Sequence, residues 1–247
     1  MNIRLCLASP LHLQPLASSL SPPVDFAITD DVRRLGVRGA FAVLSGLDNR
    51  GAHPGLQAWR EELARQLASA LTADFIQTDP VLRGFRDLHD RVKRSNKRFV
   101  SSAEALAGLF LRKGVVPSIN PLVDIYNAVS LETRLSLGAH DVSRVQGRIT
   151  LGLARGGERF VPLGAIEPEA IQPGEYCYVD ESNEVLCRLE HRQCERTRVT
   201  PATTQCFYII QGNAATPRAM LEAALARLVE QTIRFCGGRE ERAWIVD

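Results

Sequence analysis

The sequence has no hydrophobic run long enough to cross a membrane, because no stretch approaches the roughly 18 uncharged apolar residues that a transmembrane helix needs. Its six cysteines form no close pair followed by a second pair, which is the spacing of a zinc site. A chain of 247 residues can bury a core without disulfides. We therefore expect reduced thiols, a cytoplasmic location and no association with membranes.

Familiar catalytic signatures are missing too. The chain contains no glycine-lysine phosphate loop, no dinucleotide fingerprint and no nucleophile elbow, and its five histidines are not spaced as metal ligands. No cofactor and no metal are expected. A catalyst with this sequence would use water positioned by polar groups, with no covalent nucleophile.

The net positive charge is small, but basic residues are concentrated in one stretch. The net charge is only +2, yet seven basic residues between positions 83 and 98 face only Asp87 and Asp90. Such a run is either a solvated surface or a set of phosphate contacts. The seven are Arg83, Arg86, Arg91, Lys93, Arg94, Lys97 and Arg98.

Hydrophobic spacing predicts helices in the first half of the chain and strands in the second. Helices are expected at about 55–75, 80–93, 101–114 and 121–132, and a last one at 217–235. Strands are expected within 26–48 and at 149–154, 159–164, 175–180, 184–192 and 206–212. This order predicts an α+β protein with a leader at 1–25, one domain at 26–236 and a C-terminal tail at 237–247.

Short polar side chains are concentrated on the helix predicted at 121–132. Asn120, Asp124 and Asn127 follow one another at helical spacing between apolar neighbours. Amide and carboxyl groups placed in this way fit a helix face that lines a polar binding cavity. The alternative is structural: Asn120 would cap the helix before its first proline, and Asp124 and Asn127 would be satisfied core groups.

A second polar segment spans residues 188–205. Glu195 lies among Arg192, Arg196 and Arg198, which would keep it ionised if they are close, and Thr197 adds a hydroxyl donor. The alternative is a strand edge with alternating charges. Elsewhere, His140 beside Asp141 is either an acid/base pair or a structural histidine.

The run INPLVDIYNAVSLETRLSLGAHD, continued by RVQGRITLGLARGGERFVPLG, resembles the B3/B4 domain, the tRNA-editing domain of the phenylalanyl-tRNA synthetase beta subunit. The later RTRVTPATTQ resembles the closing segment of that domain, so the similarity spans about residues 100 to 212. The resemblance implies a three-layer α+β fold, in which a sandwich of sheets is flanked by helices. The chain lacks a synthetase module and an anticodon-binding domain, and therefore looks like a freestanding version.

The resemblance also implies roles for individual residues. The pocket asparagine of the family falls on Asn127, and the glutamate that recognises the tyrosine hydroxyl falls on Glu195. A threonine of the family falls on Tyr126 and a histidine falls on Gly138, so the shape of the pocket and its tyrosine specificity are expected to differ. His140, two positions further on, is our candidate to replace the missing histidine.

The expected function is removal of a mischarged amino acid from tRNA, with water as the nucleophile. Asn127, Asp124 and His140 would be catalytic, and the basic run would hold tRNA phosphates. The alternatives are a non-catalytic module that binds tRNA, an amino acid or a similar small ligand, and a protein-interaction domain that kept only the fold. Substrate contacts are expected from Glu195, Tyr126, Asn120, Gly138 and Thr197.

Overall fold

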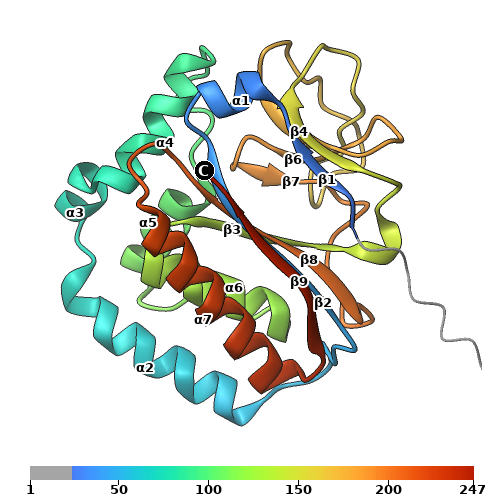
Figure 1. The fold of residues 1–247 in the computed structure, drawn as a ribbon. Helices are drawn as coiled ribbons and strands as arrows, with labels where there is room; N and C mark the ends of the chain where they lie inside the picture. The colour runs from blue at the N-terminus through green and yellow to red at the C-terminus, as the bar shows by residue number, and fades with distance from the viewer. Residues whose placement is uncertain (1–23) are drawn as a thin grey trace, which may run out of the picture.

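The computed structural model describes residues 24–247 and contains two β-sheets packed face to face (Figure 1). The four-stranded sheet has the order β3-β8-β2-β9, and every neighbouring pair is antiparallel. The five-stranded sheet has the order β1-β4-β5-β6-β7, with only β1 and β4 parallel. The strands are β1 (Phe26–Ile28), β2 (Arg38–Ser45), β3 (Ser136–Asp141), β4 (Ile149–Leu153), β5 (Tyr176–Val179), β6 (Val185–Arg188), β7 (Arg192–Gln193), β8 (Gln205–Gly212) and β9 (Arg239–Val246).

Helices cover the outer face of the four-stranded sheet, so that the molecule has three layers (Figure 1). Helices α6 and α7 pack on this sheet and on each other, and α2 packs outside α6. The α+β, three-layer prediction is confirmed. The helices are α1 (Asp30–Arg34), α2 (Pro54–Ala70), α3 (Ala73–Thr78), α4 (Pro80–Arg91), α5 (Ser102–Lys113), α6 (Pro121–Thr133) and α7 (Arg218–Cys236), with a 3₁₀ turn at Val142–Arg144.

Local chemistry explains where the helices begin and end. The Ser101 hydroxyl accepts the Glu104 N–H at the start of α5, and Gly114 ends that helix with φ +69°. The helix predicted at 55–75 divides in two, because Thr72 caps a new helix by accepting the Phe75 N–H.

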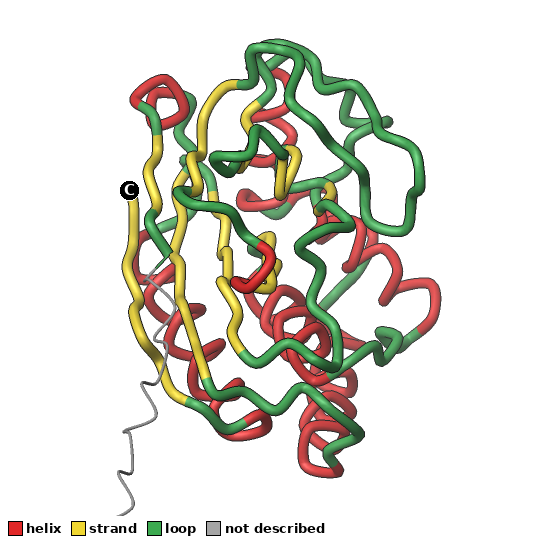
Figure 2. Tube along the Cα trace, turned by 90° about the vertical axis from the view of Figure 1, so that its right-hand side faces the viewer, coloured by secondary structure: helices red, strands yellow, loops and turns green. Residues whose placement is uncertain are grey.

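Aromatic side chains fill the space between the two sheets. Phe26 of β1 lies with its ring centroid 4.4 Å from that of Phe41, and Phe41 stacks on Phe207 of β8. Strands β2 and β8 are buried almost throughout, as expected for the middle of three layers. Figure 2 shows that long loops connect the short strands of the five-stranded sheet.

Further segments differ from their predicted structure. Residues 136–141, for which no element is predicted, form β3; both faces are buried, so the period-two signal is absent. The strand predicted at 159–164 makes only isolated bridges through Arg159 and Pro162. Residues 237–247, treated as a tail, contain β9, whose Trp244 stacks on Phe41. The predicted leader lies almost wholly outside the described residues.

No helix among residues 24–247 is both long enough and apolar enough to cross a membrane.

Candidate functional site

A pocket of about 340 Å³ lies where the edge strands of the two sheets face each other. Strand β3 is the edge of the four-stranded sheet, and β7 is the edge of the five-stranded sheet. The start of α5, the middle of α6, the turn between β6 and β7, and strand β8 complete the wall. The volume is at the lower end of the range for small-ligand sites, which is roughly 300–1,000 Å³.

Helix α6 contributes Tyr126 and Asn127 to this pocket, and both side chains are half-buried. Neither side chain forms a hydrogen bond with another residue of the described chain, so both polar groups are available to a ligand. Burial, with smaller effects from Asp124 and Cys187, raises the pKa of Tyr126 well above its usual value. The phenol therefore stays protonated and can donate a hydrogen bond.

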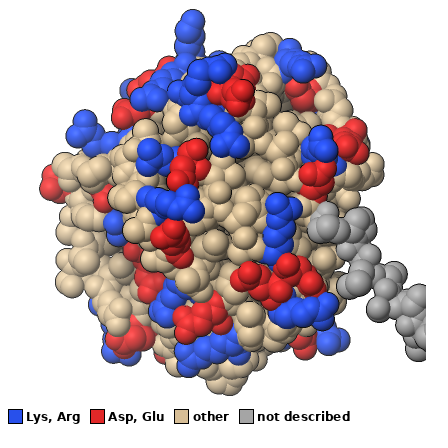
Figure 3. Space-filling view, in the orientation of Figure 1, with Lys and Arg blue, Asp and Glu red and all other residues tan. Residues whose placement is uncertain are grey.

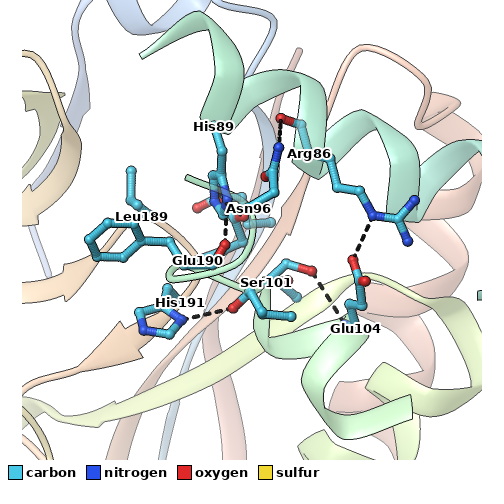
Figure 4. Close-up of polar contacts among 12 residues, drawn as sticks. Arg86, His89, Asn96, Ser101, Glu104, Leu189, Glu190 and His191 are labelled. Atoms are coloured by element: carbon cyan, nitrogen blue, oxygen red, sulfur yellow. Dashed lines mark hydrogen bonds and ion pairs between the residues drawn. The ribbon is translucent and has the colours of Figure 1, made fainter. Parts of the chain in front are cut away.

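Glu190, in the turn between β6 and β7, supplies a buried carboxylate to the pocket wall (Figure 4). Its Oε2 accepts hydrogen bonds from the Tyr176 hydroxyl and from Nε2 of Gln211, the latter at 3.1 Å. Oε1 of Gln211 in turn accepts the Tyr178 hydroxyl at 2.9 Å. This network fixes the Glu190 carboxylate and the Gln211 amide in one orientation.

His89 of α4 pairs with Glu190 from behind the pocket (Figure 4). Its Nε2 lies 2.6 Å from Oε1 of Glu190, and its Nδ1 lies 2.9 Å from the Phe99 carbonyl oxygen. Two acceptors beside the two ring nitrogens favour the doubly protonated, positively charged form of the ring. Burial alone would lower the pKa of His89, but Glu190, helped by the Phe99 carbonyl and Asn96, raises it above the usual 6.5.

This raised pKa predicts the pH dependence of stability. The folded protein binds the His89 proton more tightly than the unfolded chain, so the pair stabilises most below the unfolded pKa of about 6.5. We expect the stability advantage of wild type over His89→Gln, measured by urea unfolding, to shrink from about pH 6 to about pH 9. An advantage that grows with pH would contradict the assignment of a charged His89.

His191 is a pocket histidine of a different kind. It is half-buried, and its Nδ1 lies 2.8 Å from the Val100 carbonyl oxygen, which can only accept a hydrogen bond. In the neutral ring the proton therefore sits on Nδ1, which leaves the lone pair of Nε2 free. Such a nitrogen can accept a proton from water.

Asp124 and Asn120, two predicted site residues, do not line the small pocket but a larger one of about 1010 Å³. Both have internal partners. Asp124 pairs with Arg60 at 3.0 Å and accepts hydrogen bonds from the Ser118 hydroxyl and the Ile119 N–H. Asn120 caps α6 by accepting the Val123 N–H at 3.2 Å. These contacts match the structural alternative, so the two residues are not brought together with Asn127.

His140 and Thr197 contact each other but do not line the small pocket. Nδ1 of His140 lies 2.7 Å from the Thr197 hydroxyl, and both residues are fully buried. Burial, with Arg196 adding to it, lowers the pKa of His140 to about 3, so its ring is neutral. His140 therefore does not occupy the place of the missing pocket histidine.

Glu195 also lies outside the small pocket. It forms an ion pair with Arg198 at 2.8 Å and accepts the Gly164 N–H at 2.9 Å. The carboxylate at the pocket belongs to Glu190, five residues earlier in the chain. Sequence reasoning missed Glu190 because the nearby arginines and the family resemblance both pointed to Glu195. In the structure Arg196 pairs with Asp180 and Glu184 instead.

The basic run extends along α4 and the segment that leads from it to the pocket. Arg86 and Arg94 are half-buried and paired with Glu104 and Glu175. Figure 3 shows Lys and Arg side chains gathered at the upper edge of the molecule, with carboxylates among them. The segment ends at Val100, which lines the pocket. The exposed members of the run are Arg83, Arg91, Lys93, Lys97 and Arg98.

Within residues 24–247, no group of three or more His, Cys, Asp or Glu side chains is arranged to hold a metal ion. Four buried cysteines in this range lie in strands or helices: Cys177, Cys187, Cys206 and Cys236. Burial raises the pKa of each thiol, and for Cys177 the value rises to about 12.

Comparisons with known proteins agree on one family. The model of the B3/4 domain family matches residues 86–237. The phenylalanine–tRNA ligase beta subunit of Mycoplasma genitalium is 32% identical over 117 residues, which are 47% of this chain and 14% of that subunit. The beta subunit of Photorhabdus laumondii is 42% identical over 57 residues, 23% of this chain and 7% of that subunit. The chain thus matches only a small part of either relative.

Among solved structures, an N-terminal fragment of the phenylalanyl-tRNA synthetase beta subunit from Pyrococcus horikoshii has a similar fold. The TM-score is 0.50 at 14% identity, and the match covers 91% of this chain and 54% of that fragment. At this identity the likeness concerns the fold alone.

Proposed function

This chain belongs to the B3/4 domain family, and on that premise we propose that it hydrolyses the ester bond of mischarged aminoacyl-tRNA. The observation that carries the proposal is the small pocket at the edge of the sandwich. It holds an unpaired amide on α6 and a histidine with a free Nε2, and the basic segment ends at its wall. Release of the amino acid from mischarged tRNA by the purified protein is the direct test.

The pocket groups suggest how water would attack the ester. Nε2 of His191 takes a proton from water, whose oxygen bonds to the carbonyl carbon. The Asn127 amide and the Tyr126 hydroxyl donate hydrogen bonds to the oxygen that becomes negative. The bond from that carbon to the ribose oxygen then breaks, and the ribose oxygen takes up the proton from His191. The products are a free amino acid and uncharged tRNA.

The exposed basic residues would hold the tRNA backbone. We expect Lys93→Gln/Lys97→Gln to weaken tRNA binding and to reduce the slope of log affinity against log salt by between about 1 and 2, because two phosphate contacts are lost. Filter binding over a range of salt concentrations measures this slope.

A matched control is Arg112→Gln/Lys113→Gln, which removes two exposed charges at the end of α5, beside the larger pocket. This pair should leave the slope unchanged. Equal losses in both double variants would mean that tRNA is attracted by overall charge, and would remove the basic run from the proposal.

A second candidate is a non-catalytic module that binds an amino acid or a similar small ligand. The paired state of Glu190 favours it, since the buried carboxylate of this pocket is tied to His89, Tyr176 and Gln211. Such a module would be stabilised thermally by its ligand but would leave every aminoacyl ester intact.

A further inference from the structure

Gly138 of β3 and Gln193 of β7 compete for one space at the mouth of the small pocket. A Cβ atom added to Gly138 would lie 2.0 Å from Nε2 of Gln193 and 3.1 Å from its Cδ. The first distance is far below ordinary van der Waals contact and the second is slightly below it. The φ of Gly138 is not in the left-handed region, so its backbone would accept other residues. The end of the Gln193 side chain occupies the space of a Cβ at position 138 and must move to make room for one.

The backbone of Gln193 is firmly held while its amide is free. Gln193 pairs with Cys187 in the sheet, and its carbonyl oxygen accepts the Leu163 N–H at 2.8 Å. Its side-chain amide forms no hydrogen bond with any residue of 24–247, although it is half-buried and lines the pocket. A polar group placed in this way without a partner costs free energy unless water or a ligand satisfies it.

We propose that Gln193 contacts the substrate of this pocket, reaching from the five-stranded sheet into the space that a side chain at position 138 would otherwise fill. This inference rests on the proposed function for the identity of the substrate. Asn127 then offers one amide from α6 and Gln193 offers another from β7. Each amide has donors and an acceptor, so the pair fits an uncharged polar group such as a hydroxyl or an ester carbonyl.

Competition between the two positions can be measured without any ligand. Gly138→Ala should lower the urea midpoint of wild type, because its Cβ must displace Gln193. The same change in a Gln193→Ala background should lower the midpoint by less than half as much. Equal shifts in both backgrounds would show that the two residues do not compete for this space.

Substrate contact is measured by turnover and by ligand binding. Gln193→Ala should lower kcat/KM for deacylation at least 10-fold. It should also weaken, by a similar factor, the binding of a non-hydrolysable analogue in which the amino acid is joined to adenosine by an amide bond. Gln66→Ala, which removes an exposed amide on α2, is the matched control and should change neither quantity.

Placing a polar side chain at position 138 instead of 193 tests whether this space contacts the substrate, because a purely structural role of Gln193 would not change the pH dependence of activity. In Gly138→His/Gln193→Gly the imidazole takes the vacated space, and activity should return with a new dependence on pH near about 6.5. The comparison with wild type isolates this imidazole, because both proteins share the other titratable groups around the pocket. These are Tyr126, Cys187, Glu190, His191 and Arg192, with His89 behind Glu190.

The outcomes separate this inference from the proposed function. If wild type hydrolyses esters and Gln193→Ala does so equally well, the inference fails and the function stands. If no ester is hydrolysed but the analogue binds, and binds more weakly to Gln193→Ala, the inference stands and hydrolysis fails. If no ester is hydrolysed and the analogue does not bind to wild type, both are overturned.

Discussion

Replacement of Asn127 by alanine should lower kcat/KM for release of a mischarged amino acid by about 10²–10³, the usual effect of removing one donor from an oxyanion site. Asn127 is half-buried at the pocket and has no hydrogen-bond partner among the described residues. Its loss should therefore leave the free energy of unfolding within about 0.5 kcal/mol of wild type. Single-turnover deacylation and urea unfolding measure the two quantities.

Two comparisons sharpen this expectation. Gln66→Ala removes an amide from the exposed face of α2 and should keep full activity. Asp124→Asn weakens the ion pair with Arg60 at the larger pocket, so its effect should appear in stability before activity. A variant Asn127→Ala that turns over as fast as wild type would remove this residue from the site.

The largest effect on stability is expected at Glu190. Glu190→Ala removes the buried partner of His89, whose ring must then lose its proton, and it also frees the Tyr176 hydroxyl and the Gln211 amide. The two side chains of the pair are only 1% and 2% exposed. Breaking a pair buried so deeply costs about 3–5 kcal/mol, so urea unfolding should show a loss of this size.

Glu195→Ala is the natural control, because it removes a glutamate only five positions away. In its ion pair with Arg198 the Glu195 side chain is 31% exposed and the Arg198 side chain 53%, so the loss should not exceed about 1 kcal/mol. A Glu195 variant that is destabilised as strongly as the Glu190 variant would contradict the division between buried and exposed carboxylates.

The sequence predicted those elements whose signals are local. The helix at α6 and the cap of α5 depend on nearby residues, Asn120 and Ser101, and both lie where the spacing placed them. Strand β3 was missed because SLGAHD is buried on both faces and shows no alternation. Strand β9 was missed because its pairing with β2 joins residues about 200 positions apart, which no local pattern reports.

The site was less predictable, since it depends on which side of an element a residue faces. Helical spacing put Asp124 and Asn127 in one line, yet they line different pockets, because different elements surround the two positions of α6. The nearby arginines and the resemblance pointed to Glu195, although partners from α4 and β8 decide that Glu190 is the buried carboxylate. The free amide of Gln193 could be recognised only once β7 was placed beside Gly138.

The measurement that tests the central claim most directly is deacylation of a panel of correctly and incorrectly charged tRNAs by the purified protein. We expect at least one mischarged tRNA to lose its amino acid much faster than it does without protein, and correctly charged tRNAs to remain intact. If every ester survives at protein concentrations at which tRNA is bound, the chain is a recognition module and the hydrolytic proposal is wrong.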